Sequence, residues 1–142
     1  MSEARASGVA SGPGLADLGP LARKVLDYTH TMSRLAPDVK RPEDWAPLAE
    51  FVSVDEFERV GTPFEVQDWK QYTELLTRWA SATDKFETAA RRISELRDLV
   101  YFEIEERHFR GGDVHVVHSL TVFAFDEHGK IRHLDVYLQR PH

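Results

Sequence analysis

The C-terminal third of the chain carries the pattern that most restricts its fold, an alternation of apolar and polar residues with a period of two. Residues 101–106 read Tyr-Phe-Glu-Ile-Glu-Glu, and residues 114–125 are rich in β-branched and aromatic types. This period is typical of strands that bury one face, and β-branched residues favour the same structure. Turn residues separate the segments at 110–113 and at 126–130, where glycine permits a tight hairpin. The sequence therefore predicts an antiparallel meander that ends near Gln139.

Three amphipathic helices are expected before the meander, because apolar residues recur there with helical spacing. Pro20 suits the first turn of the first helix, and Asp68 with Gln71 resembles a capping box that opens the third. The apolar stripes are Leu21, Val25, Tyr28, Met32 and Leu35, then Trp45, Leu48, Ala49 and Val52, then Trp69, Tyr72, Leu76 and Trp79. This order predicts the α+β class, with three N-terminal helices packed on a curved antiparallel sheet.

The length of 142 residues suits one domain. Residues 1–19 consist mainly of small residues such as Ser, Ala and Gly, which offer too little apolar surface to offset the entropy of ordering them. We therefore expect a flexible leader over residues 1–19 and a single domain over residues 20–142.

Charge and composition exclude several classes of function. The 18 Lys and Arg against 24 Asp and Glu give a formal charge of −6, and the chain has no cysteine. An acidic chain without a basic cluster argues against nucleic-acid binding, and the absence of cysteine excludes disulfide scaffolds and thiol nucleophiles. No stretch approaches the ~20 apolar residues of a membrane span. The expectation is a cytoplasmic protein without membrane contact.

The hairpin predicted at Gly111-Gly112 sets the register of its two strands. The residue pairs that share one face are then Phe109 with Val114, His108 with His115, Glu106 with Val117, Ile104 with Ser119, and Phe102 with Thr121. We expect this face to lie under the helices and to line a pocket for a small apolar molecule, with Glu106, His108 and His115 near the tip. The alternative is that these polar residues are merely solvated at an exposed tip.

The residues expected on the opposite face of the sheet favour a protein partner, and the spacing of the histidines argues against a metal site. It carries Val116, Leu120 and Val122, which are too apolar to face water as one patch, so we expect a homodimer through this face. His115 and His118 are three residues apart on a strand and point to opposite faces, so they cannot close on one ion. We expect no metal and no cofactor.

Three short motifs resemble the nuclear-transport-factor-two-like (NTF2-like) superfamily, which includes ketosteroid isomerases, limonene-epoxide hydrolases and SnoaL-like polyketide cyclases. Residues 125–131, Phe-Asp-Glu-His-Gly-Lys-Ile, look like the penultimate turn of the isomerases. Residues 134–137, Leu-Asp-Val-Tyr, match the final strand, and residues 57–61, Phe-Glu-Arg-Val-Gly, match an acidic motif. The resemblance implies a cone-shaped α+β barrel and makes residues 86–94 a strand, although their local propensity favours helix.

The resemblance also implies catalytic residues. It places Glu58 where the isomerases hold a proton-shuttling carboxylate, which burial beside Phe57 and Val60 would make a usable base, and Tyr28 near the phenol that binds the oxyanion. Thr121 stands where the isomerases have a protonated acid, and therefore supplies a weaker donor. The cyclases and epoxide hydrolases imply a different pair, His118 and Asp135, which the predicted register places on the outer face. Substrate contacts are expected from Thr121, His108, His115, Phe102, Trp69 and Phe123.

The leading hypothesis is a cofactor-independent acid/base enzyme of isomerase, cyclase or epoxide-hydrolase type that acts on a small apolar metabolite. Because a fold does not fix its chemistry, a non-catalytic ligand-binding or dimerisation module of the same fold is the alternative. An accessory domain that docks on another protein is a third possibility.

Overall fold

The computed structural model describes residues 18–61 and 65–139. In chain order the elements are α1 (Pro20–Leu35), the short 3-10 helices η3 (Ala36–Asp38) and η4 (Pro42–Trp45), α2 (Ala46–Ala49), β1 (Glu58–Gly61), β2 (Glu65–Gln67), α3 (Trp69–Ser81), β3 (Lys85–Leu96), β4 (Leu99–Arg110), β5 (Asp113–Phe125) and β6 (Ile131–Gln139). The α+β class with three α-helices before the meander is confirmed. The leader expected over residues 1–19 lies almost wholly outside the described residues.

Both long helices begin at defined caps. The Asp68 carboxylate accepts a hydrogen bond from the Gln71 backbone N–H at 2.8 Å, and the Gln71 side chain accepts one from the Asp68 N–H at 2.9 Å, as the capping box predicts. Helix α1 has Pro20 in its first turn, and the Glu95 carboxylate from β3 accepts from the Ala22 N–H at 2.9 Å. This contact anchors the start of α1 to the sheet.

The described strands form one six-stranded sheet in the order β2-β1-β6-β5-β4-β3. The hairpin register is confirmed in full, with Phe102 opposite Thr121 and His108 opposite His115. The expected strand over residues 86–94 is also confirmed as part of β3. One pair departs from the expected antiparallel sheet, because β1 runs parallel to β6. The sheet is therefore mixed, and it does not close into a barrel.

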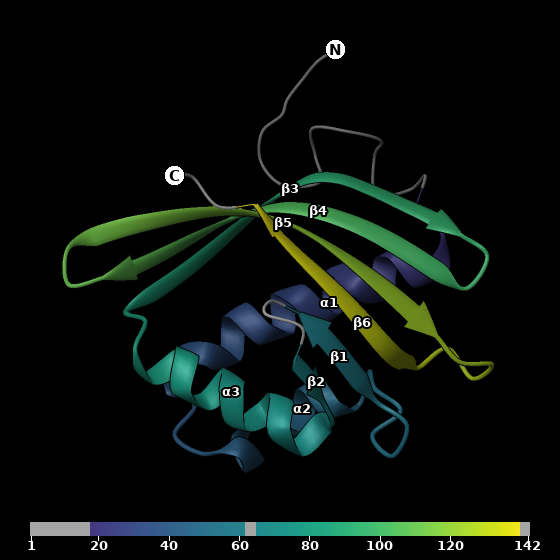
Figure 1. Ribbon diagram of the computed structural model, residues 1–142, viewed down its shortest axis with the longest axis horizontal. Coiled ribbons are helices and arrows are strands. Elements are labelled where there is room, and N and C mark those ends of the chain that lie inside the picture. The colour runs from purple at the N-terminus through teal and green to yellow at the C-terminus, as the bar shows by residue number, and fades with distance from the viewer. Residues whose placement is uncertain (1–17, 62–64, 140–142) are drawn as a thin grey trace.

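The helices cover the concave face of the curved sheet, while the β4–β5 hairpin extends beyond them (Figure 1). Register shifts at Ala90/Arg92 and at Ala124/Phe125 interrupt the strand pairing, and such bulges bend a strand. The core between the layers includes the fully buried side chains of Trp45, Leu48, Val25, Phe125, Ile131 and Leu134. Burial of each such side chain stabilises the fold by about 1.5–3 kcal/mol. No helix in the described part of the chain is long and apolar enough to cross a membrane.

Candidate functional site

The curvature leaves a cavity of about 730 Å³ between the concave sheet face and helices α1 and α3. This volume is typical of small-molecule sites. Six of the residues expected to be at the site line it: Tyr28, Phe102, His108, His115, Thr121 and Phe123. Since the face that carries them lies under the helices, the predicted orientation of the hairpin is confirmed.

The expected burial of Glu58 is wrong. Its side chain is 57% exposed and lies 3.3 Å from Nδ1 of His133 on the outer face of the sheet. The physical reason is strand alternation: Glu58 pairs with His133 and Arg59 pairs with Leu134, so successive side chains of β1 point to opposite faces. Arg59, one residue later, is the β1 side chain that lines the cavity.

Three other expected residues lie outside the cavity. His118 and Asp135 are on the outer face, as the register predicts: His118 pairs with Glu105 at 3.3 Å and Asp135 with His133 at 3.0 Å. Trp69 packs edge-on against Phe57, with ring centroids 5.2 Å apart, and does not line the cavity. The expected contact between Trp69 and a substrate is therefore not supported by its position.

Arg59 is held in the cavity by neutral groups. Its Nη1 donates to the Gln67 side-chain oxygen at 3.2 Å, and its guanidinium carbon lies 5.3 Å from the centre of the Tyr72 ring. Gln67 is buried, with 7% of its surface exposed. This arrangement fixes the plane of the guanidinium through one hydrogen bond and one cation–π contact.

Two buried phenols lie beside this arginine. The Tyr28 hydroxyl is fully buried and has no partner in good hydrogen-bond geometry within residues 18–61 and 65–139. Burial raises the pKa of Tyr28 well above its ordinary value, and the nearby Tyr72 phenol raises it further. Burial also raises the pKa of Tyr72. Both groups therefore keep their protons at neutral pH and remain hydrogen-bond donors.

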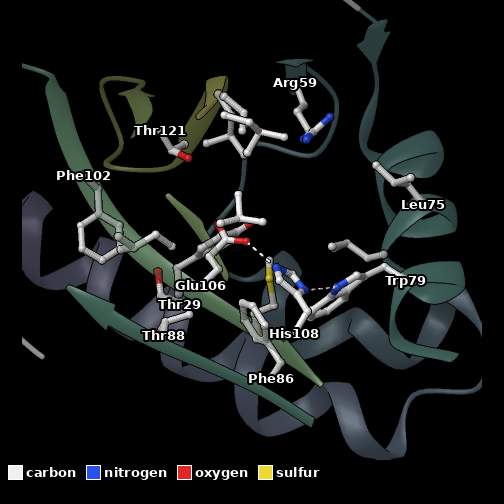
Figure 2. A pocket seen from close by; sticks show the side chains of 18 of the residues that line it. Thr29, Arg59, Leu75, Trp79, Phe86, Thr88, Phe102, Glu106, His108 and Thr121 are labelled. Atoms are coloured by element: carbon white, nitrogen blue, oxygen red, sulfur yellow. Dashed lines mark hydrogen bonds and ion pairs between the residues drawn. The ribbon is translucent and has the colours of Figure 1, made fainter. Parts of the chain in front are cut away.

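A hydrogen-bonded chain of side chains forms the second polar part of the cavity (Figure 2). The indole N–H of Trp79, from α3, donates to Nδ1 of His108 at 3.0 Å. Nε2 of His108 lies 3.0 Å from Oε1 of Glu106, and the Ser119 hydroxyl donates to Oε2 of Glu106 at 2.8 Å. The side chains of Glu106 and His108 are only 19% and 15% exposed.

Trp79 determines which nitrogen of His108 carries the proton. An indole N–H can only donate, so Nδ1 of His108 accepts and the ring proton lies on Nε2. Nε2 then donates to Glu106, which receives one neutral donor on each oxygen. The chain thus presents Glu106 as a carboxylate, and His108 as a donor to it rather than a base.

The polar groups of the cavity define the chemistry that it can offer. In residues 18–61 and 65–139, no three side chains of His, Cys, Asp or Glu are grouped so that they could hold a metal ion. What the cavity offers is a carboxylate, phenolic donors and a guanidinium among apolar side chains. These groups can accept a proton, donate hydrogen bonds and stabilise negative charge.

Sequence reasoning missed the roles of Arg59 and Trp79. The alternation along β1 was a possible signal for Arg59, but a strand of four residues gives little evidence of its own phase. Glu106 and His108 are two residues apart on a strand, so their shared face could be predicted. No local pattern connects Trp79 with His108, because 29 residues separate them.

Comparison with known proteins supports the fold. No protein-family model matches the sequence, and no curated protein matches it. A candidate SnoaL-like polyketide cyclase from Shewanella putrefaciens matches with TM-score 0.73 at 9% identity, over 97% of this chain and 92% of the other. An NTF2-like protein from Anabaena variabilis gives TM-score 0.70 at 11% identity, over 90% and 97% of the two chains.

An LEH-like epoxide hydrolase from M. tuberculosis also matches, with TM-score 0.62 at 17% identity over 84% of this chain and 86% of the other. The chain therefore has the NTF2-like α+β fold, and the resemblance drawn from its turn and strand motifs is confirmed at the level of fold. Identities this low establish the architecture and leave the activity to be argued from the cavity itself.

Proposed function

We propose that this protein is a cofactor-independent acid/base catalyst that acts on a small, mainly apolar molecule with a carbonyl group. One observation carries the proposal: the Glu106 carboxylate lines an apolar cavity and is held by His108 and Ser119, two neutral donors. A carboxylate that lacks a cationic partner keeps its ability to accept a proton from a bound ligand. Activities of cyclase and epoxide-hydrolase type among proteins of this fold are consistent with such chemistry.

The proposed step is proton transfer next to the carbonyl group. Glu106 accepts a proton from the adjacent carbon, and the electron pair of the broken C–H bond moves toward the carbonyl oxygen. Phenolic O–H groups of Tyr28 and Tyr72, together with the Thr121 hydroxyl, stabilise the resulting enolate. Glu106 then returns the proton to the same carbon or to a neighbouring one, so protons and electrons balance without a cofactor.

Hydrogen–deuterium exchange tests the role of Glu106 without knowledge of the natural substrate. We expect the protein to accelerate exchange at the carbon next to the carbonyl of 2-tetralone in D2O, followed by proton NMR. Glu106→Gln keeps the shape of the side chain but removes the base, and should lower the rate by about 100-fold or more. Glu105→Gln is the matched control, because Glu105 is the next residue on β4 and pairs with Arg107 on the outer face.

Equal exchange rates in the wild type and in Glu106→Gln would reject Glu106 as the base. If the wild type binds 2-tetralone without accelerating exchange, the non-catalytic ligand-binding module becomes the better description. Circular dichroism of each variant verifies that the fold is intact.

We also propose that the protein forms a homodimer through the outer face of its sheet. Cross-strand register brings Tyr101 beside Val122, and Leu120 beside Tyr137. Tyr101 and Tyr137 are 38% and 58% exposed. We call these four residues the outer apolar patch.

Charged groups of both signs surround the outer apolar patch. They include the Arg92–Glu103 pair at 2.8 Å and the Glu58–His133–Asp135 cluster. An apolar centre with a charged rim of mixed sign is typical of protein interfaces. Because one surface offers both signs, a second copy related by a two-fold axis could match its own rim.

A further inference from the structure

The guanidinium of Arg59 is a cation inside the cavity without an anionic partner. Among the described residues it contacts the Gln67 amide and both the ring and the hydroxyl of Tyr72, and neither residue carries negative charge at neutral pH. Placing a cation among apolar side chains costs free energy unless an anion compensates it. The arrangement therefore matches a ligand that brings the negative charge.

The cavity's own carboxylate does not supply this charge. Glu106 is bound by His108 and Ser119. The Trp79–His108–Glu106 chain lies across the cavity from Arg59 in Figure 2. A ligand could thus contact Arg59 with one group and Glu106 with another.

Gly61 makes room for the Arg59 guanidinium. Both residues belong to β1 and are two positions apart, so they lie on the same face. A Cβ atom at position 61 would lie 2.8 Å from Nη1 of Arg59 and 3.0 Å from its guanidinium carbon. The glycine therefore allows the guanidinium to fold over its own strand, and an alanine there would displace the tip of this flexible side chain.

The hydrogen-bonding capacity of Arg59 is mostly unused. A guanidinium has five N–H donors in a planar fork. One is given to the Gln67 side-chain oxygen and one interacts with the Tyr72 hydroxyl, so donors remain for a ligand. The fork matches the two oxygens of a carboxylate, and such paired charge-assisted bonds are strong. Contact with Tyr72 and Gln67 orients it in advance of binding.

We propose that the ligand of this cavity carries a carboxylate group that Arg59 binds, with its apolar body against Leu75, Trp79, Phe86 and Phe102. This inference names the ligand class of the proposed catalytic site. It rests on the proposed proton transfer by Glu106 only for the carbonyl group of the ligand, and not for the carboxylate. The substrate would then be an apolar keto acid, whose carboxylate is held by Arg59 while Glu106 acts beside the carbonyl.

A matched pair of probes isolates the carboxylate. Titration calorimetry would compare 4-phenylbutyrate with 4-phenylbutanamide, which have nearly the same shape and differ in charge. We expect the wild type to bind the carboxylate about tenfold more tightly or better, because charge-assisted bonds between a guanidinium and a carboxylate are stronger than bonds to a neutral amide. Arg59→Gln should remove this preference and leave the affinity for the amide nearly unchanged.

Two further variants localise the effect. Gly61→Ala retains Arg59 but displaces its guanidinium, and should weaken binding of the carboxylate more than binding of the amide. Arg110→Gln removes the other arginine that lines the cavity, an exposed residue at the hairpin tip, and should leave the preference in place.

Several results would overturn the proposal: equal affinity of the wild type for both probes, binding of neither probe at millimolar concentration, or loss of the preference in Arg110→Gln instead of Arg59→Gln. Failure of the proposed function is distinguishable from these results. In that case Glu106→Gln leaves deuterium exchange unchanged, while the preference for the carboxylate still depends on Arg59.

Discussion

At the scale of single residues, the Tyr28 hydroxyl is proposed to donate to a ligand, and its burial lowers the stability of the fold. Its ring is only 3% exposed and contacts Phe51 and Phe123 edge-on, with centroids 6.1 and 5.8 Å away, while its hydroxyl makes no well-formed hydrogen bond with the described residues. A buried hydroxyl without a good partner costs about 1–3 kcal/mol. Such a cost at a cavity wall is consistent with a group kept for its ligand.

Tyr28→Phe should therefore stabilise the protein at neutral pH, by about 1 kcal/mol. The aromatic packing is retained, and only the poorly bonded hydroxyl is lost. Urea unfolding measures the change. A clear loss of stability in the variant would show that the hydroxyl is well bonded in solution, in conflict with its geometry here.

The raised pKa of Tyr28 predicts a loss of stability in alkali. The unfolded phenol titrates near 10.0, and burial holds the folded value well above this. The unfolded state thus loses its proton first, and the free energy of unfolding falls as pH rises from about 10 through the folded value. Between about pH 9 and about pH 11 the wild type should lose more stability than Tyr28→Phe. An equal loss of stability in Tyr28→Phe would contradict the raised pKa of Tyr28.

At the scale of elements, turn chemistry and strand period predict the β4–β5–β6 meander, whereas the strand over residues 86–94 is expected from the family resemblance alone. Gly111 and Gly112 both have positive φ, at 56° and 89°, and this local requirement fixes the long β4–β5 register. The phase of β1 could not be predicted in the same way. Its parallel partner β6 lies more than 70 residues further along the chain, and no turn connects the two directly. Because this local constraint is missing, the sequence predicts Glu58 in the cavity where the structure has Arg59.

The turn between β3 and β4 contains Arg97 in a left-handed backbone conformation that an arginine disfavours. Arg97 has φ of 58° and is exposed, in the left-handed region where a side chain costs about 1 kcal/mol relative to glycine. Arg97→Gly should raise the free energy of unfolding by roughly 0.5–1 kcal/mol, measured by thermal or urea unfolding. Gly112→Ala is the opposite change at the other hairpin and should destabilise. A lower stability of Arg97→Gly would indicate that its side chain makes a contact that offsets the strain.

At the scale of the whole molecule, one sheet serves two surfaces. Its concave face makes the cavity with helices α1 and α3, and its other face carries the outer apolar patch. Figure 1 shows the curvature of the sheet that separates the two faces. The general architecture and both faces of the hairpin could be predicted from periodicity. The polar residues of the hairpin, Glu106 among them, could be predicted to face the cavity. The positions of Trp79 and Arg59 beside them could not, because α3 and β1 are brought to the hairpin only by the tertiary fold.

If the outer apolar patch is a dimer interface, Leu120→Asp should convert the protein to a monomer, because a charge there would be desolvated in the interface. Sedimentation velocity would show the change. A stable dimer of this kind requires about 800 Å² of buried surface per partner. Val66→Asp, on the edge strand β2 at a side chain 60% exposed, is the control and should remain dimeric. A wild type that sediments as a monomer at all concentrations would refute the proposed dimer.

The alternation of side chains along β1 also has a consequence for redesign. A single residue inserted between Phe57 and β1 that moves each β1 residue one pairing position along β6 would turn the β1 side chains to the other face of the sheet. Glu58 would then line the cavity in place of Arg59, and we expect the cavity to bind amines instead of carboxylates. The charge that β1 presents to the cavity thus depends on which of two adjacent residues pairs with Leu134.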